Sequence, residues 1–178
     1  MNFSSRYVVA IHILTALAVR KRLMNTDVSM KSEMLSWSVN TNPVVVRRII
    51  SKLREAGIVT ASRGPEGGTR LSSDPKKLTL LDIYNAVDDG VLFHLHYSIP
   101  NQECPVGKNI QAGLKEALSG ADKAMRNYLA KYSLSDISSD IIERSKIKKL
   151  IENGADPKKL DEQFRKAAFE YYENYRSK

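Results

Sequence analysis

The chain has 178 residues, of which 42% are hydrophobic, with a formal net charge of +8 and a sequence pI of about 9.5. This length allows one ordinary domain with an appendage and a core that needs no disulfides. The single cysteine excludes an intrachain disulfide and fits a reducing compartment. Residues 1–75 hold 11 Lys and Arg against 5 Asp and Glu, so the positive charge is concentrated there and favours a polyanionic partner.

Residues 4–22 form the first predicted helix, capped by Ser4 or Ser5. It is apolar over so much of its circumference that it must be buried or shared with a partner. The apolar run at residues 7–19 is too short for a bilayer, which takes about 20 apolar residues, and it has no small-residue cleavage site. We therefore expect a cytoplasmic protein with no membrane contact. His12 has no second metal-ligating residue one turn away, so we interpret it as a packing residue.

Two further helices are predicted before residue 56. The shorter one starts at Ser29 or Ser32 and leads into a turn. Asn42 is a good N-cap for the next helix, and Pro43 suits its first position because a proline lacks the N–H that would have no partner there. Apolar residues at helical spacing predict the buried face of this helix: Val46, Ile49, Ile50 and Leu53. Its opposite face is largely cationic.

A short β-hairpin is predicted after this basic helix. Gly57 stands where a left-handed helix stop is expected, and Ile58, Val59 and Thr60 are strand formers. A glycine-rich turn at residues 64–68 then leads to a second strand that ends at Leu71.

This order of basic helix and hairpin is that of a helix-turn-helix followed by a wing. An α-helix fits the major groove of DNA, and a hairpin that carries an arginine suits the narrow minor groove beside it. The excess positive charge lies in the same segment. Charge and geometry therefore agree on double-stranded DNA as the partner.

Beyond the wing, Thr79 caps a helix that is stopped at residues 88–90. Residues 91–99 alternate enough to be an extended segment, and the loop at residues 100–105 contains Cys104.

A long amphipathic helix is predicted from Val106 to Tyr132. At 1.5 Å per residue it extends about 40 Å, more than so small a domain can cover by itself. We expect its apolar stripe to meet the same helix of a second subunit in a homodimer. The alternative is packing against the first helix of its own chain.

The tail is predicted as a polar turn at residues 133–139 and two helices, Ile141 to Asn153 and Pro157 to about Arg176. The last helix has an apolar stripe that includes Phe164 and Tyr171. We expect the tail to fold back on its own dimer, with a protein partner bound through the C-terminal helices as the alternative.

Several segments resemble the Rrf family of bacterial winged-helix regulators, which includes the IscR, NsrR and CymR types. They are residues 5–14 (SRYVVAIHIL), 44–59 (VVVRRIISKLREAGIV), 62–71 (SRGPEGGTRL), 78–87 (LTLLDIYNAV) and 104–111 (CPVGKNIQ). The wing phrase together with the preceding helix is the most specific of these. The resemblance covers about residues 4–137, so it implies nothing about the tail.

The resemblance implies a homodimer that binds a two-fold DNA operator. The contact residues it implies are Asn42, Val44, Val45, Arg47, Arg48 and Lys52 in the helix, and Arg63, Glu66, Gly67 and Thr69 in the wing. Arginine can chelate guanine O6 and N7, and valine can meet a thymine methyl. Arg6, Lys52, Arg54 and Arg70 suit phosphate contacts or are solvated surface charge.

The chain departs from the family in the loop before the long helix. Cluster-binding members place three cysteines there, and this chain has only Cys104. We therefore expect no iron–sulfur cluster and no other cofactor, because such clusters take four thiolates or close substitutes. At a helix N-terminus Cys104 could be a reactive thiol sensor, with an inert cysteine as the equal alternative. His94 and His96 could complete a metal site with Cys104, but we interpret them as surface histidines and expect no metal.

The predicted fold is mainly α with a small β-wing. It comprises a winged helix-turn-helix domain at residues 1–78, a sensor loop and dimerisation helix at 79–138, and a C-terminal helical extension at 139–178. The predicted function is that of a homodimeric, sequence-specific transcriptional repressor with a redox response through Cys104. The alternative is a protein–protein regulator that binds a partner enzyme. An enzyme is not expected, because the sequence has no nucleophile–base–acid set and no P-loop.

Overall fold

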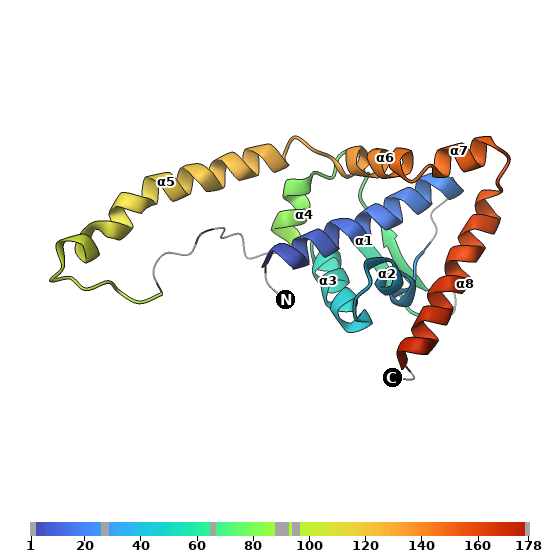
Figure 1. Cartoon of the computed structure of the whole chain (residues 1–178), viewed down its shortest axis with the longest axis horizontal. Helices are drawn as coiled ribbons and strands as arrows, with labels where there is room; N and C mark the ends of the chain where they lie inside the picture. The colour runs from blue at the N-terminus through green and yellow to red at the C-terminus, as the bar shows by residue number, and fades with distance from the viewer. Residues whose placement is uncertain (1–2, 26–28, 65–66, 88–92, 94–96, 177–178) are drawn as a thin grey trace.

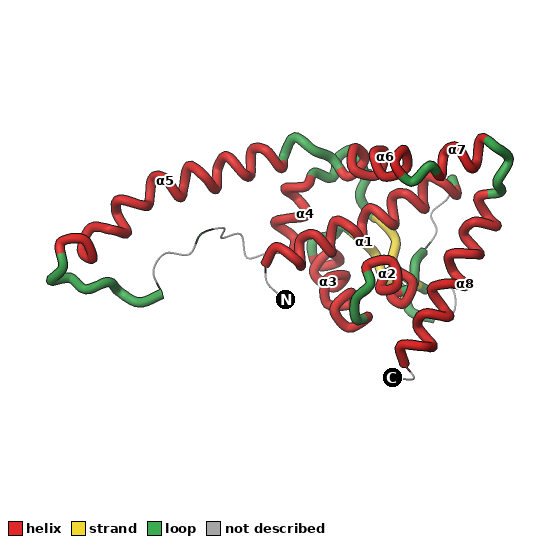
Figure 2. Tube along the Cα trace, in the orientation of Figure 1, coloured by secondary structure: helices red, strands yellow, loops and turns green. Residues whose placement is uncertain are grey.

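The computed structural model describes residues 3–25, 29–64, 67–87, 93 and 97–176. Its regular secondary structure is helical apart from one pair of short strands, and loops connect these elements (Figure 1, Figure 2). In chain order the elements are α1 (Phe3–Met24), α2 (Ser32–Val39), α3 (Pro43–Glu55), β1 (Val59–Ser62), β2 (Gly68–Leu71), α4 (Leu80–Val87), α5 (Pro105–Leu129), α6 (Leu134–Arg144), α7 (Ile147–Glu152) and α8 (Pro157–Arg176). The predicted fold class, mainly α with a small β-wing, is confirmed.

Helix α1 is the element around which the body of the molecule is assembled. It contacts α2, α3, α4, α6, α8 and β2. Its face containing Ile13, Leu14 and Leu17 is buried in the main core. A second apolar face of this helix, which contains Val8, Ile11 and Val19, lines a cavity instead.

Helices α2 and α3 form the predicted helix-turn-helix. The turn is made by Asn40, whose φ of 54° reverses the chain, and its N–H donates to the Trp37 carbonyl at 3.1 Å. Helix α2 begins at Ser32, one of the two predicted starts, with Lys31 at its N-cap and no side-chain cap.

Strands β1 and β2 form an antiparallel pair in which Val59 lies opposite Leu71 and Ser62 opposite Gly68. The predicted helix stop is confirmed, because Gly57 has a φ of 72°. The hairpin is attached to the body through Met30, whose N–H and carbonyl both pair with Thr69.

Helix α4 has the predicted N-terminal cap. The Asp82 N–H donates to Thr79 Oγ1, and the Thr79 N–H donates to Asp82 Oδ2. The predicted stop at residues 88–90 lies outside the described residues. Of the predicted extended segment, only Phe93 and residues 97–99 are described, and these form bends rather than a strand.

Helix α5 projects away from the body (Figure 1), and none of its side chains is buried. It ends at Leu129, three residues before the predicted end. The reason lies in the body, where the Leu80 N–H donates to the Tyr132 carbonyl and the Leu134 N–H to the Leu78 carbonyl. These bonds hold residues 132–134 extended beside residues 78–80.

The prediction for residues 133–139 was wrong, because this segment is the start of α6 rather than a turn. Ser133 and Asp136 form a reciprocal capping box, and Leu134 and Ser138 are buried. The predicted helix from 141 to 153 is also wrong, because Lys146 adopts a φ of 56° and separates α6 from α7. The domain boundary expected at residue 138 thus falls inside α6. The last helix agrees with its predicted bounds, and Asp156 caps it by accepting from the Lys158 N–H.

Candidate nucleic-acid interface

The orientation of α3 is fixed by its cap and its buried stripe. Asn42 is extended, and its Oδ1 accepts from the Val44 N–H at 2.8 Å. The predicted stripe of Val46, Ile49, Ile50 and Leu53 is buried in the core. The face opposite this stripe is therefore held toward solvent.

The exposed face of α3 carries three of the predicted contact residues, namely Val44, Arg47 and Arg48. Val44 is 45% exposed, although it is a large apolar residue. The Arg47 guanidinium lies 3.7 Å from Glu33 of α2 and also donates to Ser32 at 3.4 Å. Arg48 is exposed beside it. Valine next to two arginines on a solvent-facing helix is the chemistry that reads thymine methyls and guanine edges.

Two predicted contact residues of α3 lie off this face. Val45 is half-buried and packs against the core. Lys52 turns toward α4, where its Nζ donates to the Val87 carbonyl at 3.0 Å. A lysine at that place satisfies a carbonyl at the end of α4 that would otherwise have no helical partner.

The wing presents Arg63 to solvent directly after β1, and Arg70 is exposed on β2. Thr69, also predicted as a contact, is only 3% exposed, so its side chain lies between the hairpin and the body. Gly67 is buried as well. Glu66 lies outside the described residues.

Two of the three wing glycines, Gly67 and Gly68, are required by close approach of the backbone. A Cβ on Gly67 would lie 2.5 Å from the Ser62 carbonyl oxygen and 2.6 Å from the Arg63 carbonyl carbon. Gly68 has a φ of 149°, and a Cβ there would lie 2.9 Å from the Met30 carbonyl oxygen. Close approach of the backbone therefore explains why these two positions of the wing phrase are glycine.

Cys104 is exposed and stands at the N-cap of α5, where its side chain makes no capping hydrogen bond. Within the described part of the chain, no group of three His, Cys, Asp or Glu residues could hold a metal ion. His94 and His96 lie outside that part.

The matching family model covers residues 3–140 and is described as Rrf2, an iron-dependent transcriptional regulator. The chain belongs to the Rrf2 family. Its helix-turn-helix, wing and α5 all lie within the matched residues, while α7 and α8 lie beyond them.

Relatives of known name and structure agree with this membership. YwnA of Bacillus subtilis (strain 168), named as an HTH-type transcriptional regulator, is 44% identical over 139 residues, covering 78% of this chain and 98% of YwnA. A crystal structure described as a DNA-binding protein is 42% identical with a TM-score of 0.57 and covers 74% of this chain and 97% of its own. The cysteine regulator CymR of B. subtilis shares the fold at 19% identity, with a TM-score of 0.56 and coverage of 78% and 97%. The protein is thus a DNA-binding transcriptional regulator of the Rrf2 family.

The family description names iron, but the residues of this chain do not fit an iron–sulfur cluster. A cluster needs several thiolates, and the sequence contains one cysteine.

No described helix has the length and apolar character to cross a membrane.

A buried ion pair outside the predicted interface was missed. Arg20 of α1 donates from Nε and Nη2 to the two carboxylate oxygens of Asp161 in α8, at 2.5 and 2.7 Å. The only sequence signal is that Asp161 follows Leu160 of the apolar stripe, and a residue flanking a stripe is usually solvated. The pairing joins residues 141 positions apart, so local pattern could not reveal it.

Proposed function

We propose that this Rrf2 family member represses transcription as a homodimer bound to a two-fold symmetric operator. Helix α3 enters the major groove, and Arg63 on the wing enters the adjacent minor groove. The observation that carries the proposal is the exposed set of Val44, Arg47 and Arg48 on a helix whose opposite face is fully buried. An apolar residue is kept in solvent at that place, which fits a surface that becomes covered by a base.

The test is fluorescence anisotropy with DNA from upstream of the protein's own gene. Arg63→Ala is expected to weaken binding at least several-fold without changing the melting temperature. Arg144→Ala, which removes an exposed arginine of α6, is the matched control and is expected to bind as the unchanged protein. Equal operator affinity of the two variants would show that Arg63 of the wing does not contribute to DNA binding. In vitro transcription from the same DNA separates repression from activation.

Cys104 is the proposed redox input. Its thiol is exposed at the start of α5, the helix proposed to join the subunits. Hydrogen peroxide would oxidise the thiol to a sulfenic acid and release water. We expect peroxide to lower operator affinity, and Cys104→Ser to bind DNA normally without that response. A response that persists in Cys104→Ser would eliminate the cysteine as sensor.

A protein partner at the C-terminal helices is the second candidate. Of the aromatic residues that suggested it, Phe164 packs on Trp37 at a ring distance of 6.2 Å, and Tyr171 donates to Asn40 at 2.9 Å. Phe169 of α8, 65% exposed, supports it. Recovery of a partner enzyme by the unchanged protein but not by Phe169→Ala, with operator binding equal in both, would favour this candidate.

A further inference from the structure

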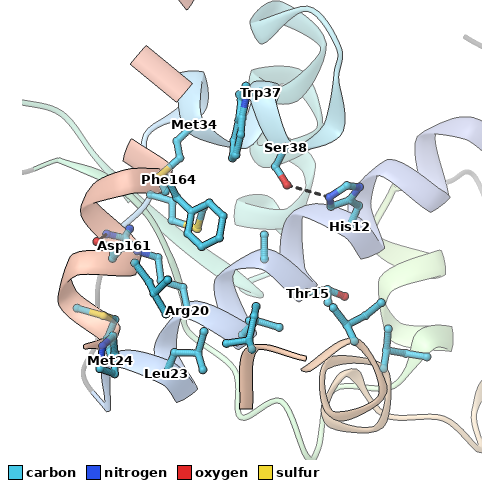
Figure 3. A pocket seen from close by; sticks show the side chains of 18 of the residues that line it. His12, Thr15, Arg20, Leu23, Met24, Met34, Trp37, Ser38, Asp161 and Phe164 are labelled. Carbon is cyan, nitrogen blue, oxygen red and sulfur yellow. Dashed lines mark hydrogen bonds and ion pairs between the residues drawn. The ribbon is translucent and has the colours of Figure 1, made fainter. Parts of the chain in front are cut away.

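A cavity of about 430 Å³ lies between the helix-turn-helix and the C-terminal helices (Figure 3). The second apolar face of α1 forms one wall, with Val8, Ile11 and Val19. Helix α2 contributes Met34 and Trp37, and the other wall comes from α6, α7 and α8. Small-molecule sites are typically mostly apolar spaces of roughly 300 to 1,000 Å³.

The wall opposite α1 and α2, here called the closing wall, lies mostly in the part of the chain beyond the family match. Ile147 and Ile151 of α7, and Leu160 and Phe164 of α8, line it. The family match ends at residue 140. The left-handed turn at Lys146 lets α7 leave the direction of α6. The cavity is therefore built from the family's helix-turn-helix and an extension that lies beyond the family match.

The polar residues of the cavity leave no net charge for a ligand. The lining is apolar apart from five residues: His12, Thr15, Arg20, Ser38 and Asp161. Arg20 and Asp161 neutralise each other in the wall, and Arg20 also donates to the Ser29 carbonyl at 2.6 Å. His12 Nε2 lies 3.0 Å from Ser38 Oγ, and burial lowers the pKa of His12, which favours the neutral ring.

One polar atom of the wall has no protein partner. Thr15 is 7% exposed, and its Oγ1 is buried without a hydrogen-bond partner in the described structure. A buried hydroxyl that makes no hydrogen bond carries an uncompensated desolvation cost. A ligand oxygen that reached Oγ1 would remove that cost.

We propose that this cavity binds a neutral, largely apolar small molecule with one hydrogen-bonding group, and that this ligand is an effector of DNA binding. Three methionines in the wall, Met24, Met30 and Met34, give it adaptable, polarisable side chains. The effector half of the proposal rests on the proposed function, whereas the binding half does not.

Contacts of the closing wall reach both DNA-reading elements. Tyr171 of α8 donates to Asn40 in the turn before α3. Asp161 holds Arg20, which donates to Ser29, and the next residue, Met30, pairs with Thr69 of the wing. A ligand that moves α8 against α1 is thereby connected to the recognition helix and to the wing.

The binding test uses N-phenyl-1-naphthylamine, a neutral apolar fluorophore. The single tryptophan of the chain, Trp37, lines the cavity, so a probe bound there accepts excitation energy from it. We expect saturable energy transfer, displacement of the probe by 1-decanol, and at least tenfold weaker displacement by decanoate because of its charge. No saturable transfer, or equal displacement by the anion, would overturn the assignment.

Neighbouring residues of α7 provide matched variants. Ile151→Trp fills the cavity, whereas Leu150→Trp places the same side chain at a position that is 49% exposed and lines no part of it. With the probe excited directly, we expect Ile151→Trp to lose at least tenfold in affinity and Leu150→Trp to stay within twofold. Ala16→Phe fills the cavity from α1 and serves if Ile151→Trp fails to fold, which circular dichroism reports. Wild-type affinity in a folded cavity-filling variant contradicts the proposal.

The effector test repeats operator binding with and without 1-decanol. We expect at least a threefold change in affinity for the unchanged protein and Leu150→Trp, and none for the cavity-filling variant. Probe binding with an unchanged operator affinity overturns the effector half alone. No operator binding without decanol refutes the proposed function, while the probe measurement, made without DNA, still decides the binding half.

Discussion

At the scale of single residues, the closest ionic contact in the described structure joins the extension to the body. Asp161 accepts from Arg20 and, at 2.8 Å, from Arg165. Burial alone would raise the pKa of Asp161, but the hydrogen bonds and charges of the two arginines hold it below its ordinary value. The side chains of Arg20 and Asp161 are almost completely buried. Removal of one partner therefore leaves the charge of the other partner buried away from water.

Asp161→Asn is therefore expected to destabilise the protein by up to about 3 to 5 kcal/mol at pH 7, as measured by urea unfolding. The pKa of Asp161 is depressed in the folded state, so the stability it contributes is present above its unfolded value of about 3.9 and is lost as pH falls below that value. The difference between the two proteins should shrink below about pH 4. Asp140→Asn, which breaks the exposed pair with Arg144, is the control and should leave the free energy of unfolding almost unchanged. A difference that is as large at pH 3 as at pH 7 would contradict the ionic explanation.

Gly67 gives a second expectation, because the atoms that exclude its Cβ are backbone atoms of Ser62 and Arg63. Gly67→Ala should displace the tip of the wing and weaken operator binding several-fold in the anisotropy assay. Gly113→Ala, in the open middle of α5, meets nothing within 4 Å and should stabilise the protein by up to about 1 kcal/mol. Unchanged operator affinity in Gly67→Ala would show that the turn of the wing does not contact the operator.

The sequence predicted those residues whose positions depend on local chemistry. The Asn42 cap and the four buried residues of α3 follow from spacing and are confirmed. The positions of Lys52 and Thr69 do not follow from spacing. Lys52 is directed by a carbonyl of α4 and Thr69 by the backbone of Met30, and both neighbours are supplied by the tertiary fold.

At the scale of elements, α5 is a helix without a covered face. Leu114 is 43% exposed and Ile110 is 37% exposed, although both belong to its apolar stripe. A stripe of this length in water favours a second copy of the same helix.

Leu114→Glu should abolish the dimer, because two carboxylates would meet near the proposed two-fold axis. Light scattering after size-exclusion chromatography should report about half the mass, and operator affinity should fall by more than tenfold. Ala112→Glu, exposed and off the stripe, should remain dimeric. If the Leu114→Glu variant were still a dimer, the subunit interface could not be the apolar stripe of α5.

Element boundaries were predictable where a cap or glycine marks them, as at Pro43 and Gly57. The start of α6 was missed because Ser133 and Asp136 resemble a polar turn until Leu134 is seen to be buried. The break between α6 and α7 has no glycine or proline, since Lys146 takes the left-handed conformation. That break depends on where α7 must pack.

At the scale of the whole molecule, the net charge of +8 belongs mainly to the half that carries the helix-turn-helix. Operator affinity should therefore fall by at least about tenfold between 50 and 200 mM salt. Arg54→Ala, at the exposed end of α3, should reduce the slope of log affinity against log salt by about one. Arg144→Ala should leave the slope unchanged, and equal slopes for the two variants would exclude Arg54 as a phosphate contact.

An antiparallel bridge between Thr79 and Ser133 closes a long excursion of the chain that contains α4 and α5. The chain reaches the start of α4 and comes back from α5 at one place, where residues 78–80 and 132–134 are joined by backbone hydrogen bonds. The body holds the two ends of this excursion together, so α5 can change in length without moving those ends apart. The length of α5, and so the distance to which it projects, can thus change by whole helical turns of about 5.4 Å while the DNA-reading body keeps its structure. In the proposed homodimer, the spacing of the half-sites can then change while base recognition by α3 is kept.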